Sequence, residues 1–108
     1  MKLKNLLQIL AISLLLPATA YAGDVAKGKQ LSATCAACHG ADGNSTIPTN
    51  PRLAGQYESY LVQALSDYRS GARKNAIMGG FATDLSDQDI KDLAAYFSSQ
   101  QSQLSVTK

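Results

Sequence analysis

The sequence contains few of the residues from which metal sites and disulfide frameworks are built. Its 108 residues include one histidine and two cysteines, and the cysteines are three positions apart. One histidine excludes a metal site made of several histidines, and two close cysteines exclude a long-range disulfide framework. The formal net charge of +2 is too small to indicate a protein that binds nucleic acid.

Strand-like alternation is nearly absent, and there is no internal repeat. The chain is long enough for one domain, and 45% hydrophobic with 17% charged residues is typical of a folded protein. Apolar residues recur at three- and four-residue intervals, which predicts helices. The predicted helices span residues 24–37, 57–70 and 86–99.

The connections between these helices are predicted to be loops, over residues 40–56 and 72–85, because they hold prolines, glycines and asparagines. The last helix has the clearest N-terminus, since Ser86 and Asp89 fit a capping box. Residues 99–108 are predicted to form a flexible polar tail.

The N-terminal segment has the layout of an export signal. Lys2 and Lys4 precede an apolar run over residues 6–16, which is too short for a comfortable membrane span. Ala20 and Ala22 are small residues at the two positions that a signal peptidase reads. An uncleaved N-terminal anchor is the alternative.

Cleavage after Ala22 would divide the chain into a signal peptide, residues 1–22, and a mature domain, residues 23–108. It would remove two lysines and no acidic residue, so that eight basic residues face eight acidic ones. The 86 residues that remain can build only a thin core of side chains. We therefore expect a bound group to help fill it.

Cys35, Cys38 and His39 form the motif with the most specific chemical meaning. Residues three and four apart share one face of a helix, so the three side chains can converge on one flat object. Two thiols at this spacing can form thioethers with the vinyl groups of a haem, and the histidine can offer a ring nitrogen to its iron. The two long loops would then wrap this large ligand.

Two other interpretations of the cysteine pair are weaker. A thioredoxin-like disulfide needs a βαβ context, which is absent. Half of a zinc site needs two further ligands, and residues 23–108 hold no other cysteine or histidine.

Met78 is the candidate for the sixth ligand of the iron. It is the only methionine beyond the signal peptide, and it lies in a predicted loop between Ile77 and Gly79. A methionine is often a flexible core filler, but a glycine-flanked loop favours a ligand. A thioether stabilises ferrous iron and raises the reduction potential, which suits an electron carrier.

The order and spacing of these motifs resemble the short bacterial class I cytochromes c, single-haem periplasmic carriers whose fold also forms each half of the small dihaem cytochromes c. The resemblance covers residues 23–99. It rests on Cys-Ala-Ala-Cys-His-Gly at 35–40, Asn-Pro-Arg-Leu-Ala-Gly-Gln-Tyr at 50–57, Tyr-Arg-Ser-Gly-Ala-Arg at 68–73, Met78, Leu-Ser-Asp-Gln-Asp-Ile at 85–90 and Leu-Ala-Ala-Tyr-Phe at 93–97.

The resemblance implies an all-α, small cytochrome c fold in which three to four helices wrap one covalent haem c. Cys35 and Cys38 would attach the haem, and His39 and Met78 would ligate its iron. The carbonyl of Pro51, or of the competing Pro48, would accept the other N–H of the histidine ring.

The resemblance also implies that the N-terminal helix crosses the C-terminal one, with Gly28 and Leu31 against Leu93 and Tyr96. Arg52 could pair with a haem propionate, because a partly shielded carboxylate favours a charge-assisted donor, or could face solvent.

The implied function is to shuttle one electron at a time between extracytoplasmic redox proteins of a respiratory chain, with a membrane oxidase or reductase as a candidate partner. The protein would be periplasmic, a monomer or weak oligomer, and no enzyme, because both axial positions of the iron are filled. Three alternatives remain: a haem sensor or peroxidase-like protein in which Met78 dissociates, a thiol–disulfide oxidoreductase, and a dedicated subunit that feeds electrons into one enzyme complex.

A docking surface is expected where one haem edge approaches the solvent. Its small or apolar border would consist of Ala36, Ala37, Gly40, Ile77, Gly79 and Gly80. A basic rim could steer an acidic partner, and its candidates are Lys27, Lys29, Arg69, Arg73 and Lys74.

Overall fold

The computed structural model describes residues 22–104, and this part of the chain contains helices and no strands. The predicted signal peptide, apart from Ala22, and the last four residues of the predicted tail lie outside the described residues. The elements are α1 (Val25–Leu31), the 3₁₀ helix η2 (Ser32–Thr34), α2 (Ala36–His39), α3 (Glu58–Ser70), α4 (Ala76–Ala82) and α5 (Asp87–Ser99). The prediction of an all-α fold is confirmed.

Helices α3 and α5 begin and end within one residue of their predicted limits, because local signals fix their ends. The Ser86 side chain accepts the N–H of Asp89, and the Asp89 carboxylate accepts the N–H of Ser86, which is the predicted capping box. Gly71 ends α3 in the left-handed conformation, with φ of 83°.

The first predicted helix is interrupted. The Ser32 hydroxyl donates to the carbonyl of Lys29, and the Thr34 hydroxyl donates to that of Leu31. Hydroxyl groups that bond nearby carbonyls compete with regular helix geometry. The chain therefore passes through η2 and re-enters a short helix, α2, that carries the cysteine motif.

The prediction of an uninterrupted loop over residues 72–85 is wrong, because α4 lies within it. The side chain of Asn75 caps this helix by accepting the N–H groups of Ile77 and Met78. Asparagine is among the strongest N-cap residues, and α4 also packs against α3. Cap and packing together outweigh the poor helix propensity of Gly79 and Gly80.

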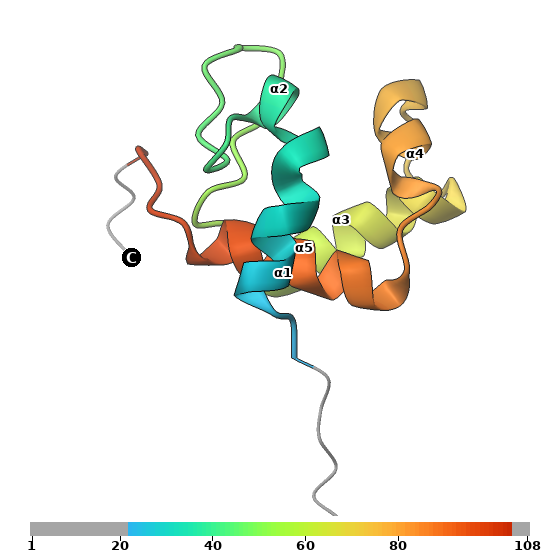
Figure 1. Ribbon diagram of the computed structural model, residues 1–108. Helices are drawn as coiled ribbons and strands as arrows, with labels where there is room; N and C mark the ends of the chain where they lie inside the picture. Colours follow the sequence, from blue (N-terminus) through green and yellow to red (C-terminus); the bar gives the residue numbers. More distant parts are fainter. Residues whose placement is uncertain (1–21, 105–108) are drawn as a thin grey trace, which may run out of the picture.

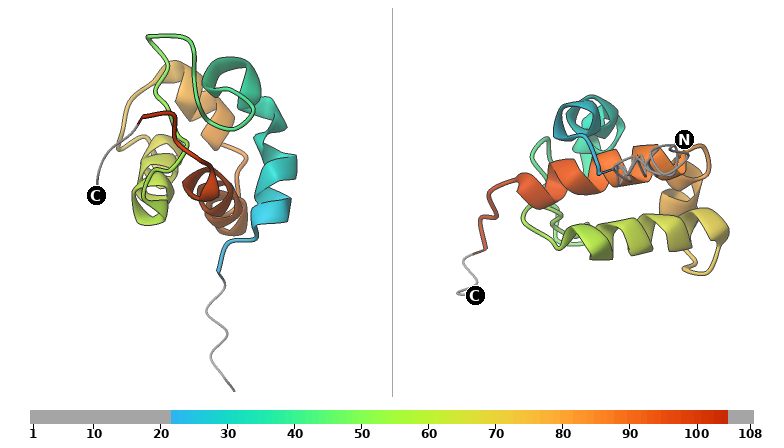
Figure 2. Two further views of the ribbon diagram at one scale, coloured as in Figure 1. Left: turned by 90° about the vertical axis from the view of Figure 1, so that its left-hand side faces the viewer. Right: turned by 90° about the horizontal axis from the view of Figure 1, so that it is seen from below.

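The long helices form a layer that supports the shorter ones. α3 and α5 lie side by side, and α1 packs across the other side of α5 (Figures 1 and 2). α2 and α4 both rise from the same side of the α3–α5 layer (Figure 1). Between residues 22 and 104, no helix has the length and apolar character that a membrane span requires.

The crossing of α1 and α5 depends on Gly28, as predicted from the family resemblance. Gly28 is buried, and a Cβ atom there would overlap the backbone carbonyl of Asp92 and approach the Cβ of Tyr96 to 2.8 Å. The buried Asp92 carboxylate accepts the N–H of Asp24 at 2.8 Å. The Tyr96 hydroxyl donates to the carbonyl of Ala41 at 2.8 Å, which ties the crossing to the loop after the cysteine motif.

Gly28→Ala is expected to lower the free energy of unfolding of the haem-loaded protein by about 1–3 kcal/mol, because the two backbones must move apart. Denaturant unfolding followed by circular dichroism measures the effect. Gln30→Ala, at an exposed position of the same helix, should change the value by less than about 0.5 kcal/mol. An equal effect of the two substitutions would contradict the importance of the close crossing.

Candidate functional site

The cysteine motif places two thiols and one imidazole on a single helical turn. Cys35 is the N-cap of α2, and Cys38 and His39 lie within it. Both thiols are unpaired and half-buried, whereas His39 is only 7% exposed. Burial raises the pKa of the Cys35 thiol, although a contact with the Thr34 hydroxyl at 3.9 Å acts in the opposite direction.

The ring of His39 is oriented by the loop that follows it. Its Nδ1 lies 2.8 Å from the carbonyl oxygen of Pro51. A carbonyl oxygen can only accept a hydrogen bond, so Nδ1 must carry the hydrogen and act as donor. In the neutral ring, Nε2 is then left with a free lone pair, which is the atom that can bind a metal.

Two side chains that sequence reasoning missed bring this loop back to the motif. Asn50 donates its Nδ2 to the carbonyl of Cys38 at 3.0 Å, and the Ser45 hydroxyl donates to the same oxygen at 3.3 Å. Since Asn50 directly precedes Pro51, its bond to α2 also places the Pro51 carbonyl beside His39. The only sequence signal was an asparagine next to the predicted proline.

Asn44 joins this loop to the end of the described chain. Its buried side chain donates to the carbonyl of Gln101 and accepts the N–H of Gln103, both at 2.9 Å. Its side-chain and backbone N–H groups also bond Asp42, and they hold the pKa of that carboxyl below its ordinary value. Residues 100–104 of the predicted tail are thus attached to the loop.

Met78 lies in α4 and is half-buried, so its predicted place in a loop is corrected to a helix. The same helix exposes two large apolar side chains, Ile77 at 68% and Phe81 at 50%. Asn75, which would be a candidate ligand from the same segment if Met78 were not the ligand, has its Oδ1 occupied by two backbone N–H groups at 3.0 Å each.

The arginines predicted near the haem differ in their surroundings. Arg52 is exposed. Arg69 is engaged within the protein, because its guanidinium bonds the carbonyl of Leu85 and the carboxylate of Asp87. The Asp87 carboxylate therefore offsets the charge that Arg69 would add to the predicted basic rim.

The donor set fits a covalently attached haem. Two unpaired thiols at the required spacing lie beside a histidine whose free nitrogen is Nε2. A zinc site does not fit, since nowhere in residues 22–104 do three histidine, cysteine, aspartate or glutamate side chains gather as metal ligands.

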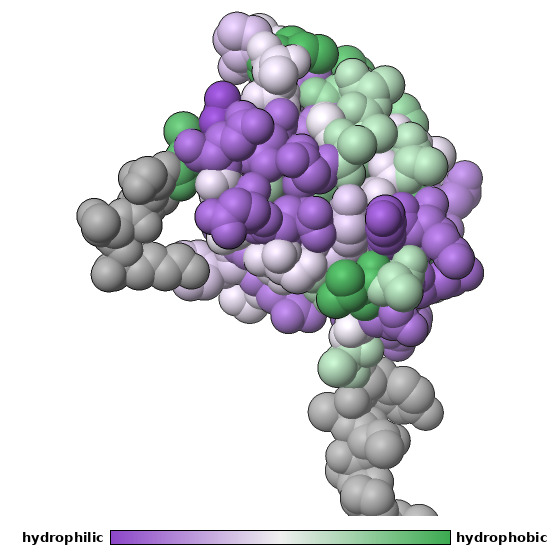
Figure 3. Space-filling view, turned by 60° about the vertical axis from the view of Figure 1, so that its left-hand side comes forward, coloured by the Kyte–Doolittle hydropathy of each residue, from purple (hydrophilic) through white to green (hydrophobic). Residues whose placement is uncertain are grey.

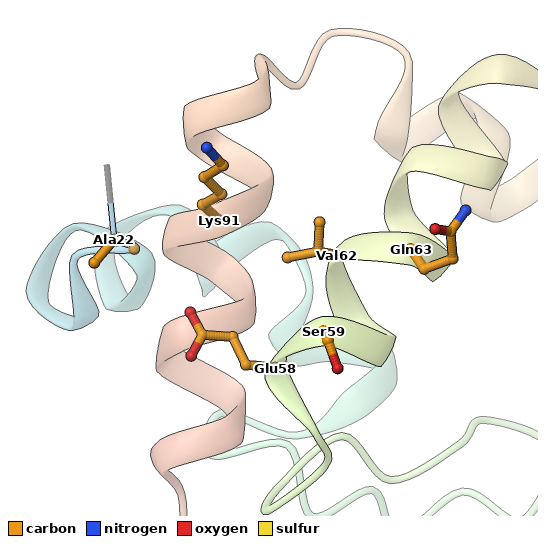
Figure 4. Close-up of a pocket in the computed structure, with 7 residues that line it drawn as sticks. Ala22, Glu58, Ser59, Val62, Gln63 and Lys91 are labelled. Atoms are coloured by element: carbon orange, nitrogen blue, oxygen red, sulfur yellow. The ribbon is translucent and has the colours of Figure 1, made fainter. Parts of the chain in front are cut away.

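A separate surface hollow of about 510 Å³ lies between α3 and α5 (Figure 4). Its lining residues are Ala22, Gly23, Glu58, Ser59, Val62, Gln63 and Lys91. None of them belongs to the cysteine motif or to α4, so the hollow is distinct from the haem-binding residues.

A helical domain in which two free thiols directly precede a buried, oriented histidine defines a c-type haem protein. The chain belongs to the cytochrome c family, because the family model described as cytochrome c matches residues 25–101. The prediction of the family is confirmed. The family carries haem c through the motif formed here by Cys35, Cys38 and His39, and its members transfer electrons.

Individual relatives agree with this assignment. Cytochrome c4 of Pseudomonas aeruginosa is 50% identical over 99 residues, which cover 91% of this chain and 49% of the relative. Cytochrome c-554(548) of Halomonas halodenitrificans is 48% identical over 83 residues, 74% of this chain and 100% of the relative. The crystal structure of reduced recombinant cytochrome c4 from Pseudomonas stutzeri matches with a TM-score of 0.73 at 47% identity, over 77% of this chain and 48% of that one. The chain spans about half the length of the cytochrome c4 relatives.

Proposed function

We propose that the protein is a periplasmic single-haem carrier that shuttles electrons between redox proteins, with His39 and Met78 as the axial ligands. The haem supplies reversible one-electron transfer at its iron. The chain supplies the covalent attachment, the ligand atoms and the surface that partners contact. Export rests on the predicted signal peptide, and covalent attachment prevents loss of the group outside the cytoplasm.

The observation that carries the proposal is the hydrogen bond between His39 Nδ1 and the carbonyl of Pro51. It fixes the plane of the ring and leaves Nε2 as the donor, and such a partner also increases the basicity of the ligand. Because His39 is buried, water competes poorly for the same nitrogen. In the folded protein, His39 is therefore held in the orientation in which Nε2 can bind iron.

Met78 is supported as the second ligand by its chemistry and its position. Its helix, α4, rises from the same side of the α3–α5 layer as α2, which carries His39 (Figure 1). A thioether favours ferrous iron. With both axial positions filled by side chains, no position is open for oxygen or peroxide, which favours an electron carrier over a sensor or a peroxidase-like protein.

The proposed docking surface combines small apolar residues with weak positive charge. Mildly hydrophobic residues gather over η2 and α2 on the face shown in Figure 3. Ala37 and Ile77 are exposed, and they can contact a partner without a large desolvation cost. Lys27, Lys29 and Lys74 are exposed and remain as candidates for steering charges.

Small inorganic oxidants of opposite charge test this surface without knowledge of the native partner. Lys74→Glu is expected to slow oxidation by an anionic reagent such as ferricyanide about two- to fivefold, and to accelerate oxidation by a trivalent cationic cobalt complex, because local charge acts within a Debye length of about 8–10 Å. Stopped-flow absorbance measures both rates, and the reduction potential should stay unchanged. Lys91→Glu, in the hollow of Figure 4, is the matched control.

The salt dependence distinguishes apolar from electrostatic docking. Rates of electron transfer from the unaltered protein to its redox partner should fall by less than about tenfold between low and physiological salt. A fall by several orders of magnitude would contradict a docking surface dominated by apolar contact. Equal effects of the two lysine substitutions would contradict a local steering role of Lys74.

A further inference from the structure

The segment that carries Met78 is fastened to α3 at its C-terminal end by one arginine. Arg69 Nη1 donates to the carbonyl of Leu85 at 2.9 Å, and Nη2 bonds the Asp87 carboxylate at 2.5 Å. The two acceptors lie at the junction between α4 and α5. Arg69 thus connects α3 to residues that lie 16 and 18 positions further along the chain.

A second arginine fastens the other end of the same segment to the same helix. The N–H of Arg73 donates to the carbonyl of Asp67 at 3.1 Å. Its guanidinium lies 4.8 Å from the ring centroid of Tyr68 and donates to the Tyr60 hydroxyl at 3.3 Å. The ring contact and the hydrogen bond both join this guanidinium to α3.

Between these two attachments the segment is stiffened by its own helix. The Asn75 side chain accepts the N–H groups of Ile77 and Met78, so the backbone of Met78 is fixed directly. The Met78 segment, residues 71–86, is therefore an arch: both of its ends are attached to α3, and α4 lies between them. Moving Met78 away from its position requires at least one of the attachments to open.

We propose that Arg69 is a positioning residue that keeps the Met78 thioether in place as an axial ligand, an inference that rests on the proposed ligation by Met78. Arg69 acts through its hydrogen-bond partners, Leu85 and Asp87. Its bond to the Leu85 carbonyl contributes most, because that bond is partly buried. The ion pair contributes little, since the Asp87 side chain is 84% exposed.

Competition by imidazole for the ferric iron measures how firmly Met78 is held. Imidazole displaces the Met78 sulfur, and the sulfur-to-iron absorption band then disappears. In the exported, haem-loaded protein, Arg69→Gln is expected to lower about tenfold the imidazole concentration at which half of this band is lost. Arg69→Lys should lower it only about threefold, because one charged donor is kept. Asp87→Asn should change it by less than about twofold. Lys91→Gln, which removes a charge from α5 outside the arch, is the matched control and should have no effect.

The outcomes separate a positioning role from simple stabilisation of the fold. A lower melting temperature of Arg69→Gln with an unchanged half-displacement concentration would overturn the proposal, because the arginine would then stabilise the fold alone. Equal effects of Arg69→Gln and Lys91→Gln would overturn it as well. A sulfur-to-iron band that survives in Met78→Ala would overturn the ligand assignment and the positioning role together.

Discussion

Replacing both Cys35 and Cys38 with alanine is expected to yield an exported chain that carries no covalent haem and is largely unfolded. Of the nine buried hydrophobic residues in the described part of the chain, four are alanines, and the five larger ones are Leu61, Ile90, Leu93, Tyr96 and Phe97. A domain of this kind is stable by only about 5–15 kcal/mol. So small a core cannot replace the contacts that a bound haem supplies.

Intact mass and circular dichroism measure this outcome. The unaltered exported protein should exceed its processed polypeptide by the mass of one haem, and acid–organic extraction should leave the colour on the protein. Ala37→Ser, at the exposed position between the cysteines, keeps the attachment motif and should retain both haem and helix content. A double alanine variant with full helix content and cooperative unfolding would show that the side-chain core suffices.

The helices whose ends are set by neighbouring residues could be predicted, and the one that depends on packing could not. Ser86 and Asp89 satisfy each other within one turn, so the sequence alone locates the start of α5. Gly79 and Gly80 lower the helix propensity of α4, and the contact with α3 that offsets them is invisible in the sequence. The sequence pattern therefore predicts a loop at Met78, although this residue lies in a helix.

The same distinction applies to the site. Cys35, Cys38 and His39 are adjacent in the sequence, so their shared chemistry could be read from spacing alone. Asn44 forms hydrogen bonds with backbone groups that lie 57 and 59 positions further along the chain, and no local sequence pattern predicts such partners. Arg69 was recognisable as a charge, but its acceptors follow from the packing of the α4–α5 junction against α3.

Met78→Ala is expected to lower the reduction potential by on the order of 0.1–0.3 V, a part of the roughly 0.8 V over which axial ligands set haem potentials. The thioether stabilises ferrous iron, and its removal favours the ferric state. The sulfur-to-iron absorption band should disappear, and the ferric protein should bind added imidazole or azide. Redox titration followed by visible spectroscopy measures all three changes.

Neighbouring substitutions show whether these changes belong to Met78 itself. Ile77→Ala, at the preceding and more exposed position of α4, should leave the band and the potential nearly unchanged. Met78→Leu keeps the apolar volume but removes the sulfur, so it should reproduce the potential and spectrum of Met78→Ala with a smaller loss of stability. A Met78→Ala spectrum identical to that of the unaltered protein would show that another group is the ligand. Lys74 would then be tested next, because the Asn75 side-chain oxygen is already held by the N–H groups of Ile77 and Met78.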